Sequence, residues 1–276
     1  MTTEEIMQIA LSLSGLDEVP GDCGIVVRGE NIRRILAGID METAEIILGK
    51  RLGYDLVLSH HPVTGPMQAN FYKASDYLGE LLERAGAPAN AAQRSSDWLT
   101  KLQEGKNHPV NYGKSADTAR LLNMPYMGIH NIADALGGKL LQAFLDERLA
   151  DNPCATLKDL CDILMEVPEY QKGLTRPEIV VGREDDLCGR VFVIFGGGPF
   201  SGKEYFRAGV GTMICMHLPD EYRQRYEQEG RGNVIVCDHM ASDSIGMNAI
   251  LHKLEDMGAE VTRVAGIFND RQEGTD

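Results

Sequence analysis

The sequence of 276 residues lacks several features that would assign it to common classes of protein. No apolar run reaches the roughly 18 residues that a membrane-spanning helix needs, so we expect no passage through a bilayer. The amino terminus is acidic and amphipathic, without the basic start and apolar middle of a secretion signal. The six cysteines include no C-x-x-C pair, and Cys215 and Cys237 lie in strand-like runs. This pattern predicts buried, reduced thiols in a cytoplasmic protein.

Positive charge is also scarce. Lysine and arginine together number 27, against 41 aspartate and glutamate residues, and the net charge is −14. The densest basic stretches are interrupted by acids, and a surface of this sign repels a phosphate backbone. The composition therefore disfavours a nucleic-acid partner. The apolar content of 43% is ordinary for a globular protein, and the length allows one large α/β domain or two smaller ones.

Familiar catalytic motifs are missing as well. No G-x-S-x-G is present, which argues against a serine hydrolase. A glycine-rich loop that includes Gly196, Gly197 and Gly198 follows an apolar strand, but it matches neither the Walker A motif nor the dinucleotide fingerprint. It is a candidate for binding a substrate phosphate through backbone N–H groups. The alternative is a tight turn between strand and helix.

Strand-like and helix-like segments alternate along the whole chain, which predicts an α/β fold. The predicted strands are 21–29, 34–39, 56–59, 125–129, 178–181, 190–195, 212–216, 233–237 and 260–267. The predicted helices are 2–14, 41–52, 74–85, 91–103, 115–122, 131–149, 156–166, 220–228 and 242–257, while 64–71 and 101–114 are predicted loops. The rhythm repeats in the second part of the chain. We therefore predict two interlocked α/β halves, residues 1–123 and 124–276, with a site between them at strand ends, and the C-terminal segment packing back on the first half.

Two adjacent histidines, His60 and His61, follow the apolar run Leu56–Ser59, and Pro62 ends this predicted strand. Neighbouring side chains within a regular strand point to opposite faces. At the last residues of a strand that restriction relaxes, so both imidazoles can turn into one cleft and serve two different metal ions. The tips of parallel strands are also where open α/β sheets place their ligand sites.

Two later segments share the pattern H-x-x-x-D-[A/S]-[L/I]-G, each after a short apolar strand and at the start of a helix. The spacing places His130 with Asp134, and His239 with Asp243, on one face of a helix. A single motif of this kind is more often a solvated pair or an acid near the helix dipole. The repetition suggests duplicated halves, and together with the paired histidines it predicts a metal site.

These segments supply six candidate ligands: His60, His61, His130, Asp134, His239 and Asp243. Six are too many for one open catalytic zinc and suit two divalent ions that share a carboxylate and a water. The mixture of nitrogen and oxygen fits zinc, iron, manganese, cobalt or nickel. Asp40 either orients one of the histidines or caps the helix that starts near Met41. The other three histidines, His108, His217 and His252, are interpreted as surface or structural residues.

On these residues the chain resembles the dinuclear-metal toroid family, whose members are commonly called type 2 GTP cyclohydrolase I or "NGG-one-interacting factor three"-like proteins. The resemblance covers nearly the whole chain and rests on the order strand–H-H-P, H-x-x-x-D and late H-x-x-x-acid. By this resemblance, His60 and His61 match the paired histidines of the family and His239 matches the late histidine. In the middle motif the resemblance assigns Asp134 as the ligand, with His130 close by. Two positions depart from the family pattern: Asp243 replaces a glutamate, and Asn131 replaces a threonine.

The resemblance implies a homohexameric ring built from dimers, with two divalent ions in each subunit facing an inner cavity. It implies metal-dependent hydrolysis of a small molecule, which would be opening of the imidazole ring of a guanine nucleotide if the cyclohydrolase name applies. The alternative is a non-enzymatic metal-binding ring that acts as a scaffold, a metal carrier or a regulatory partner.

Overall fold

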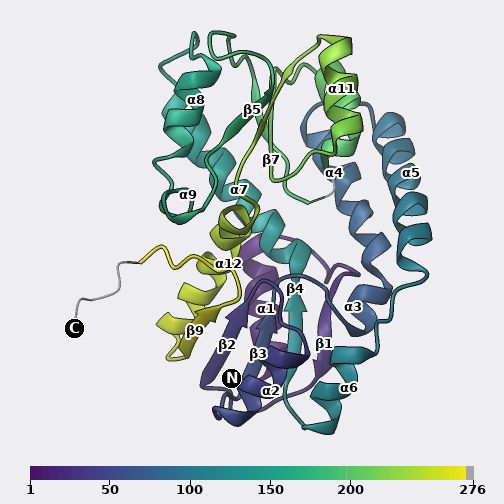
Figure 1. Cartoon of the computed structure of the whole chain (residues 1–276), viewed down its shortest axis with the longest axis vertical. Helices are drawn as coiled ribbons and strands as arrows, with labels where there is room; N and C mark the ends of the chain where they lie inside the picture. Colours follow the sequence, from purple (N-terminus) through teal and green to yellow (C-terminus); the bar gives the residue numbers. More distant parts are fainter. Residues whose placement is uncertain (197, 272–276) are drawn as a thin grey trace. The chain divides into compact units, whose positions relative to one another are not determined.

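A computed structural model describes residues 1–196 and 198–271, which form two sheets with accompanying helices (Figure 1). The α/β fold predicted from the alternation of segments is confirmed. The chain divides into two compact units. The first contains Met1–Ala74, Thr100–Leu136 and the chain from Asp243 onward, and the second contains Ser75–Leu99 and Gly137–Ser242. These units interleave along the sequence, whereas the predicted halves 1–123 and 124–276 are each continuous.

The first unit contains a five-stranded sheet in the order β1-β4-β3-β2-β9. Its strands are β1 (Cys23–Val27), β2 (Arg34–Gly38), β3 (Leu56–Ser59), β4 (Tyr126–Ile129) and β9 (Glu260–Val264). Strand β1 is antiparallel to β4, and the other neighbours are parallel. Every residue of β3 and β4 is buried, which explains why the sequences of these strands are short apolar runs.

Four helices belong to the first unit alone: α1 (Thr3–Ser14), α2 (Thr43–Arg51), α3 (Gly65–Ala69) and α6 (Lys114–Leu121). Helix α1 begins at the predicted capping box, in which Thr2 Oγ1 accepts from the backbone N–H of Glu5 and the Glu5 carboxylate accepts from that of Thr2. It ends at Gly15, whose φ of 68° is left-handed and suits glycine.

The core of the first unit lies between the sheet and these helices. Leu36, Val57 and Tyr126 from three neighbouring strands pack with Ile46 of α2 and Met67 of α3 in one buried cluster. The hydroxyl of Tyr126 donates a hydrogen bond of 2.9 Å to the backbone carbonyl of Met41. This packing holds the three strands whose carboxyl ends carry the candidate ligands.

The second unit contains a four-stranded sheet in the order β5-β8-β7-β6. Its strands are β5 (Glu178–Val181), β6 (Val191–Val193), β7 (Thr212–Cys215) and β8 (Asn233–Val236). Strands β6, β7 and β8 are parallel, and β5 is antiparallel to β8. The same order and directions relate β1, β4, β3 and β2, so the repeated rhythm of the sequence corresponds to a repeated strand topology.

The helices of the second unit are mostly short. They are α4 (Asp76–Arg84), α8 (Leu157–Leu164), α9 (Pro168–Lys172), α10 (Gly202–Arg207) and α11 (Asp220–Glu229), with a 3-10 turn at Gly198–Ser201. Three longer helices belong to one unit at their start and to the other at their end: α5 (Ala89–Asn107), α7 (His130–Leu149) and α12 (His239–Asp256).

The predicted loop 64–71 is wrong, and the predicted loop 101–114 is wrong in its first half. Residues 64–71 contain helix α3, which has Pro66 in its first turn and buries Met67 in the core. Helix α5 continues through Asn107, well into the predicted loop 101–114. The side-chain amide of Asn107 donates to the carbonyls of Gln68 and Ala69 at the end of α3. The local sequence of these segments did not indicate these contacts, because they form only when the segments meet in the folded chain.

Gly105 offers a test of the extended α5. It lies in the helix, and a Cβ atom added there would meet nothing within 4 Å. Gly105→Ala is expected to raise the free energy of unfolding by about 0.5–1 kcal/mol, because alanine loses less backbone entropy than glycine in a helix. Urea denaturation measures this. The control is Gly209→Ala, where space is equally open but φ is +88°, so a loss of stability is expected. A gain of equal size at both positions would contradict the helix assignment.

No helix in the described part of the chain is both long and apolar enough to span a membrane. All six cysteines are free thiols, and Cys215 and Cys237 are buried as predicted.

Candidate metal centre

Three neighbouring parallel strands of the first sheet end at one edge, and candidate side chains follow each of them. Asp40 follows β2, His60 and His61 follow β3, and His130 follows β4 as the first residue of α7. The register pairs Gly38 with Ser59 and Ser59 with Gly128, so the strands end at the same level. This is the edge at which open α/β sheets bind ligands.

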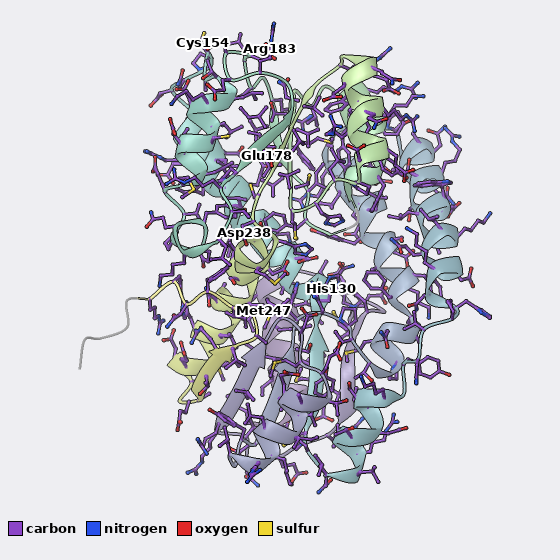
Figure 2. The ribbon with its side chains drawn as sticks, in the orientation of Figure 1. His130, Cys154, Glu178, Arg183, Asp238 and Met247 are labelled. Atoms are coloured by element: carbon purple, nitrogen blue, oxygen red, sulfur yellow. The ribbon has the colours of Figure 1, made fainter. Side chains whose placement is uncertain are left out.

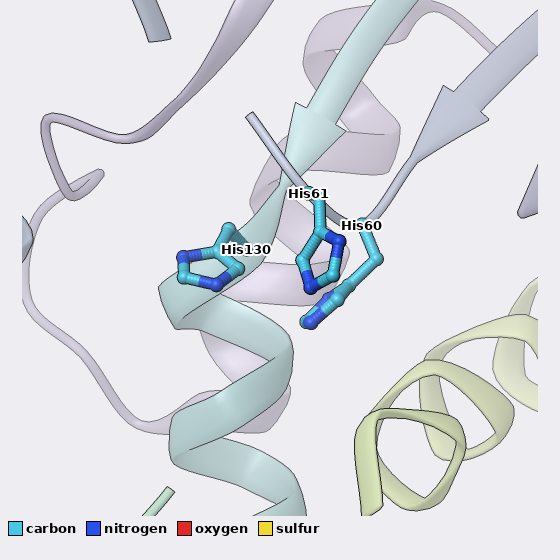
Figure 3. Close-up of side chains that lie close together, drawn as sticks. All are labelled: His60, His61 and His130. Atoms are coloured by element: carbon cyan, nitrogen blue, oxygen red, sulfur yellow. The ribbon is translucent and has the colours of Figure 1, made fainter. Parts of the chain in front are cut away.

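The three imidazoles lie together at this edge. Figure 3 shows His60 and His61 side by side after their strand, next to His130 at the start of α7. The ring centroids are 5.0 Å apart between His60 and His61, 5.0 Å between His60 and His130, and 5.7 Å between His61 and His130. The two adjacent histidines therefore turn to the same side, as the end of a strand permits.

Two carboxylates lie between the rings. Nε2 of His60 is 3.5 Å from an oxygen of Asp134 and 3.4 Å from an oxygen of Asp243. The second oxygen of Asp134 lies 3.6 Å from Nε2 of His130, and that of Asp243 lies 3.4 Å from Nε2 of His61. Each carboxylate thus faces two imidazoles. Asp243 reaches both of its rings although it is one methylene shorter than the glutamate of the family pattern.

These separations have the size expected for ligands of a shared cation. Two donor atoms that each lie about 2.1 Å from one ion, at close to the tetrahedral angle, are about 3.4 Å apart. Donor atoms of His60, Asp134 and Asp243 all lie within 4.8 Å of one another, and so do donor atoms of the three histidines. The buried cluster of histidine and aspartate could therefore hold a metal ion.

Burial of the same atoms supports this interpretation. His60 is fully buried and Asp134 is 3% exposed. Neither ring nitrogen of His60 and neither carboxylate oxygen of Asp134 makes a hydrogen bond within the described residues. Burying a carboxylate without such partners costs several kcal/mol unless a cation compensates it. The donor set fits a divalent cation that accepts nitrogen and oxygen ligands.

Two further aspartates bind the outer sides of the rings. Asp22 accepts a hydrogen bond of 2.5 Å from Nδ1 of His130, and Asp40 accepts one of 2.9 Å from Nδ1 of His61. Both leave Nε2 as the inward-facing atom, an arrangement that typically orients histidine ligands of metals. Asp40 therefore orients a histidine; the residue that caps α2 is Glu42.

Burial and neighbouring charges shift the pKa values of His61, His130 and Asp134. Burial alone would lower the pKa of His61, but the negatively charged carboxylates of Asp243 and Asp40 raise it to about 10. Burial likewise opposes protonation of His130, whose pKa is nevertheless raised by the charge of Asp134 and the hydrogen bond to Asp22. Burial raises the pKa of the Asp134 carboxyl. A cation that binds here must displace protons from the imidazoles.

His239 belongs to the second unit and is the first residue of α12, one turn before Asp243. Asp238, labelled in Figure 2, caps this helix by accepting from the backbone N–H of Ala241, and its other oxygen binds Thr175. The ring of His239 stacks on His217, with centroids 5.5 Å apart and planes 10° from parallel. Its participation as a metal ligand stays a prediction.

The glycine loop leads from β6 into the 3-10 turn that begins at Gly198. Gly196 has a φ of 77°, which favours glycine, and Gly197 lies outside the described residues. A contact between this loop and a substrate phosphate stays a prediction.

Asp22 is the residue of the centre that sequence reasoning missed. It lies directly before β1, and β1 is antiparallel to β4, with Cys23 paired to Ile129. The start of β1 therefore meets the edge at which the parallel strands end. Asp22 reaches His130 only because these two strands pair. A single aspartate before a predicted strand does not by itself indicate a contact with a histidine, so the sequence did not predict this residue.

The fold and this cluster define an α/β protein with a candidate metal centre at the carboxyl edge of a sheet. The chain belongs to the NIF3 superfamily. It is 32% identical to a NIF3 superfamily protein from Sphaerobacter thermophilus, over 96% of this chain and 98% of that one, with a TM-score of 0.90. The family resemblance inferred from the histidine motifs is confirmed.

More distant structures share the fold alone. Reduced HcgD from Methanocaldococcus jannaschii is 16% identical, with a TM-score of 0.60 over 95% of this chain and 97% of that one. A Bacillus cereus protein related to NIF3 is 11% identical, with a TM-score of 0.57 over 100% of this chain and 98% of that one. No protein-family model matches the chain, and a search of curated proteins found no match.

Proposed function

We propose that this protein is a metal-dependent hydrolase that acts on a small molecule. Its two divalent ions per subunit would be held by the six predicted ligands: His60, His61, His130, Asp134, His239 and Asp243. Zinc, iron, manganese, cobalt and nickel all suit this donor set. The resemblance to the family commonly called GTP cyclohydrolase type 2 makes ring opening of a guanine nucleotide the first reaction to test.

One observation carries the proposal. Inward-facing Nε2 atoms and carboxylate oxygens lie 3.4–3.6 Å apart in four pairs, as ligands of shared cations do. A cluster that served only to stabilise the fold would be expected to close these gaps into hydrogen bonds of about 2.7–2.9 Å.

In this proposal, the residues around the metal centre have distinct roles. Divalent ions, when bound, supply Lewis acidity and activate water for hydrolysis. Asp22 and Asp40 hold the Nδ1 protons of His130 and His61, which keeps Nε2 of each ring directed inward. The buried walls around His60 and Asp134 exclude bulk water, which strengthens electrostatic interactions in the site. The loop that includes Gly196 and Gly198 would hold a substrate phosphate.

We also propose a homohexamer built from dimers, in the cytoplasm, as the resemblance implies. Multi-angle light scattering of the purified protein tests the assembly. A mass corresponding to one or two chains of 30.3 kDa across a range of concentrations would contradict it.

Metal content and turnover test the hydrolase proposal together. We expect elemental analysis to find about two divalent ions per chain, and we expect the loaded protein to open the imidazole ring of GTP or to hydrolyse a member of a panel of phosphoesters and amides. Asp134→Asn should lose both properties, and Asp151→Asn, an exposed loop residue, should keep both. Two ions per chain without turnover of any substrate would contradict hydrolysis and favour the scaffold or metal-carrier alternative.

A further inference from the structure

A cavity of about 360 Å³ lies within the second unit. It is bounded by the first half of α5, by the chain from Phe200 to Arg207, and by α11. Cavities of about 300–1,000 Å³ are typical of sites for small molecules. None of the residues that line it is a candidate metal ligand.

The lining is positively charged, although the chain as a whole is strongly acidic. It contains four cations, Arg94, Lys203, Arg207 and Arg225, and one carboxylate, Glu204, which leaves an excess of three positive charges against −14 for the whole sequence. A cluster of this sign in an acidic protein attracts small anions locally.

Two of these cations are available to a ligand. Arg207 is bound to Glu204 at 3.0 Å, and Arg225 is bound to Glu229 at 3.2 Å. Arg94 and Lys203 make no ion pair with any residue that the structure describes. An arginine and a lysine without carboxylate partners at the wall of a cavity are suited to bind phosphate or carboxylate oxygens.

Three aromatic side chains also line the cavity. Trp98, Phe200 and Tyr222 all line the cavity, and the rings of Phe200 and Tyr222 meet edge to face at 5.1 Å. Trp98 is 46% exposed, and it lies one turn after Arg94 on the same face of α5. An exposed tryptophan beside an unpaired arginine can stack on a planar ring while the cation binds an anionic group.

This aromatic wall continues to a candidate ligand of the metal. Phe200 contacts the ring of His217 at 6.0 Å, and His217 stacks on His239. The cavity therefore adjoins the side of the second unit that carries His239.

We propose that this cavity binds a small anionic molecule with a planar ring, of the chemical class of nucleoside phosphates. Arg94 and Lys203 bind its anionic group, and Trp98 stacks on its ring. Binding at this site requires no metal ion, so the proposal stands or falls separately from the hydrolase proposal.

The chain itself supplies the probe, because Trp98 is its single tryptophan. The experiment titrates the chelator-treated full-length protein with ATP, with inorganic tripolyphosphate and with adenosine, and follows tryptophan fluorescence. We expect saturable quenching by ATP, with an affinity at least about tenfold higher than that of either fragment, because only ATP engages both the cations and the ring. Absence of saturation up to millimolar ATP, or equal affinity for tripolyphosphate, would overturn the proposal.

Variants locate the binding site. Arg94→Ala and Lys203→Ala are each expected to weaken ATP binding about tenfold, as loss of a hydrogen bond to a charged group does. Arg231→Ala removes an exposed arginine of the same unit that does not line the cavity, and it should leave binding unchanged. Thermal melts verify that all three variants are folded. Unchanged affinity in both cavity variants, or tighter binding of a single-stranded oligonucleotide than of ATP, would show that the assigned ligand class is wrong.

Discussion

Replacing Asp134 by asparagine is expected to abolish metal binding and to stabilise the metal-free protein. The carboxylate is buried, and its oxygens make no hydrogen bond within the described residues. The pKa of Asp134 is raised because burial outweighs the attraction of the neighbouring imidazoles. Without a metal ion, the ionised group therefore opposes folding, and a neutral amide of the same shape should raise the free energy of unfolding by about 1 kcal/mol or more. With a cation, the same substitution removes a ligand, and affinity should fall at least about a hundredfold.

The expected loss of metal binding and the expected gain in stability can both be measured on the same variant. Melting temperatures are compared with and without chelator, and metal content is determined by elemental analysis. The wild-type protein should melt at a higher temperature with metal, by the free energy of ligand binding, whereas Asp134→Asn should melt at one temperature under both conditions. Asp151→Asn is the matched control and should behave as wild type. A metal-dependent rise in melting temperature that is as large in Asp134→Asn as in the wild type would show that Asp134 is not a ligand.

Asp22→Asn is expected to lower metal affinity by about 10–100-fold while every predicted ligand stays in place. Asp22 accepts the Nδ1 proton of His130 at 2.5 Å and is fully buried. The amide can present its N–H to the ring in place of an oxygen, which removes the acceptor that selects the orientation and tautomer of the imidazole. Competition with a chromogenic chelator measures the affinity.

A second aspartate of the first unit separates this effect from a general loss of stability. One oxygen of Asp55 accepts from the backbone N–H groups of Arg33 and Arg34, at 2.9 Å and 2.8 Å. Asp55→Asn should therefore lower the free energy of unfolding by about 1 kcal/mol without changing metal affinity. The role assigned to Asp22 fails if Asp22→Asn binds metal as tightly as Asp55→Asn does.

Much of the fold can be predicted from local patterns, because burial imposes them on the sequence. Strands β3 and β4 are buried on both faces and read as short apolar runs. Helix α1 carries its start signal in Thr2 and Glu5, and these residues form the predicted capping box. Helix α3 and the end of α5 were not predicted. They are held together by hydrogen bonds from Asn107 to residues nearly forty positions earlier in the sequence, and no local pattern indicates such a contact.

The sequence by itself determined the α/β class, the places where the histidines occur, and the family to which the chain belongs. Each of these depends on residues close together in the chain: an apolar run, a turn, and a histidine with an acid four residues later. Tertiary structure alone decided which residues meet. The order and direction of β1, β4, β3 and β2 bring His60, His61 and His130 to one edge and add Asp22, which has no local motif. The spacing of Nε2 and carboxylate atoms that indicates a cation depends on this pairing of distant strands, and no local pattern encodes it.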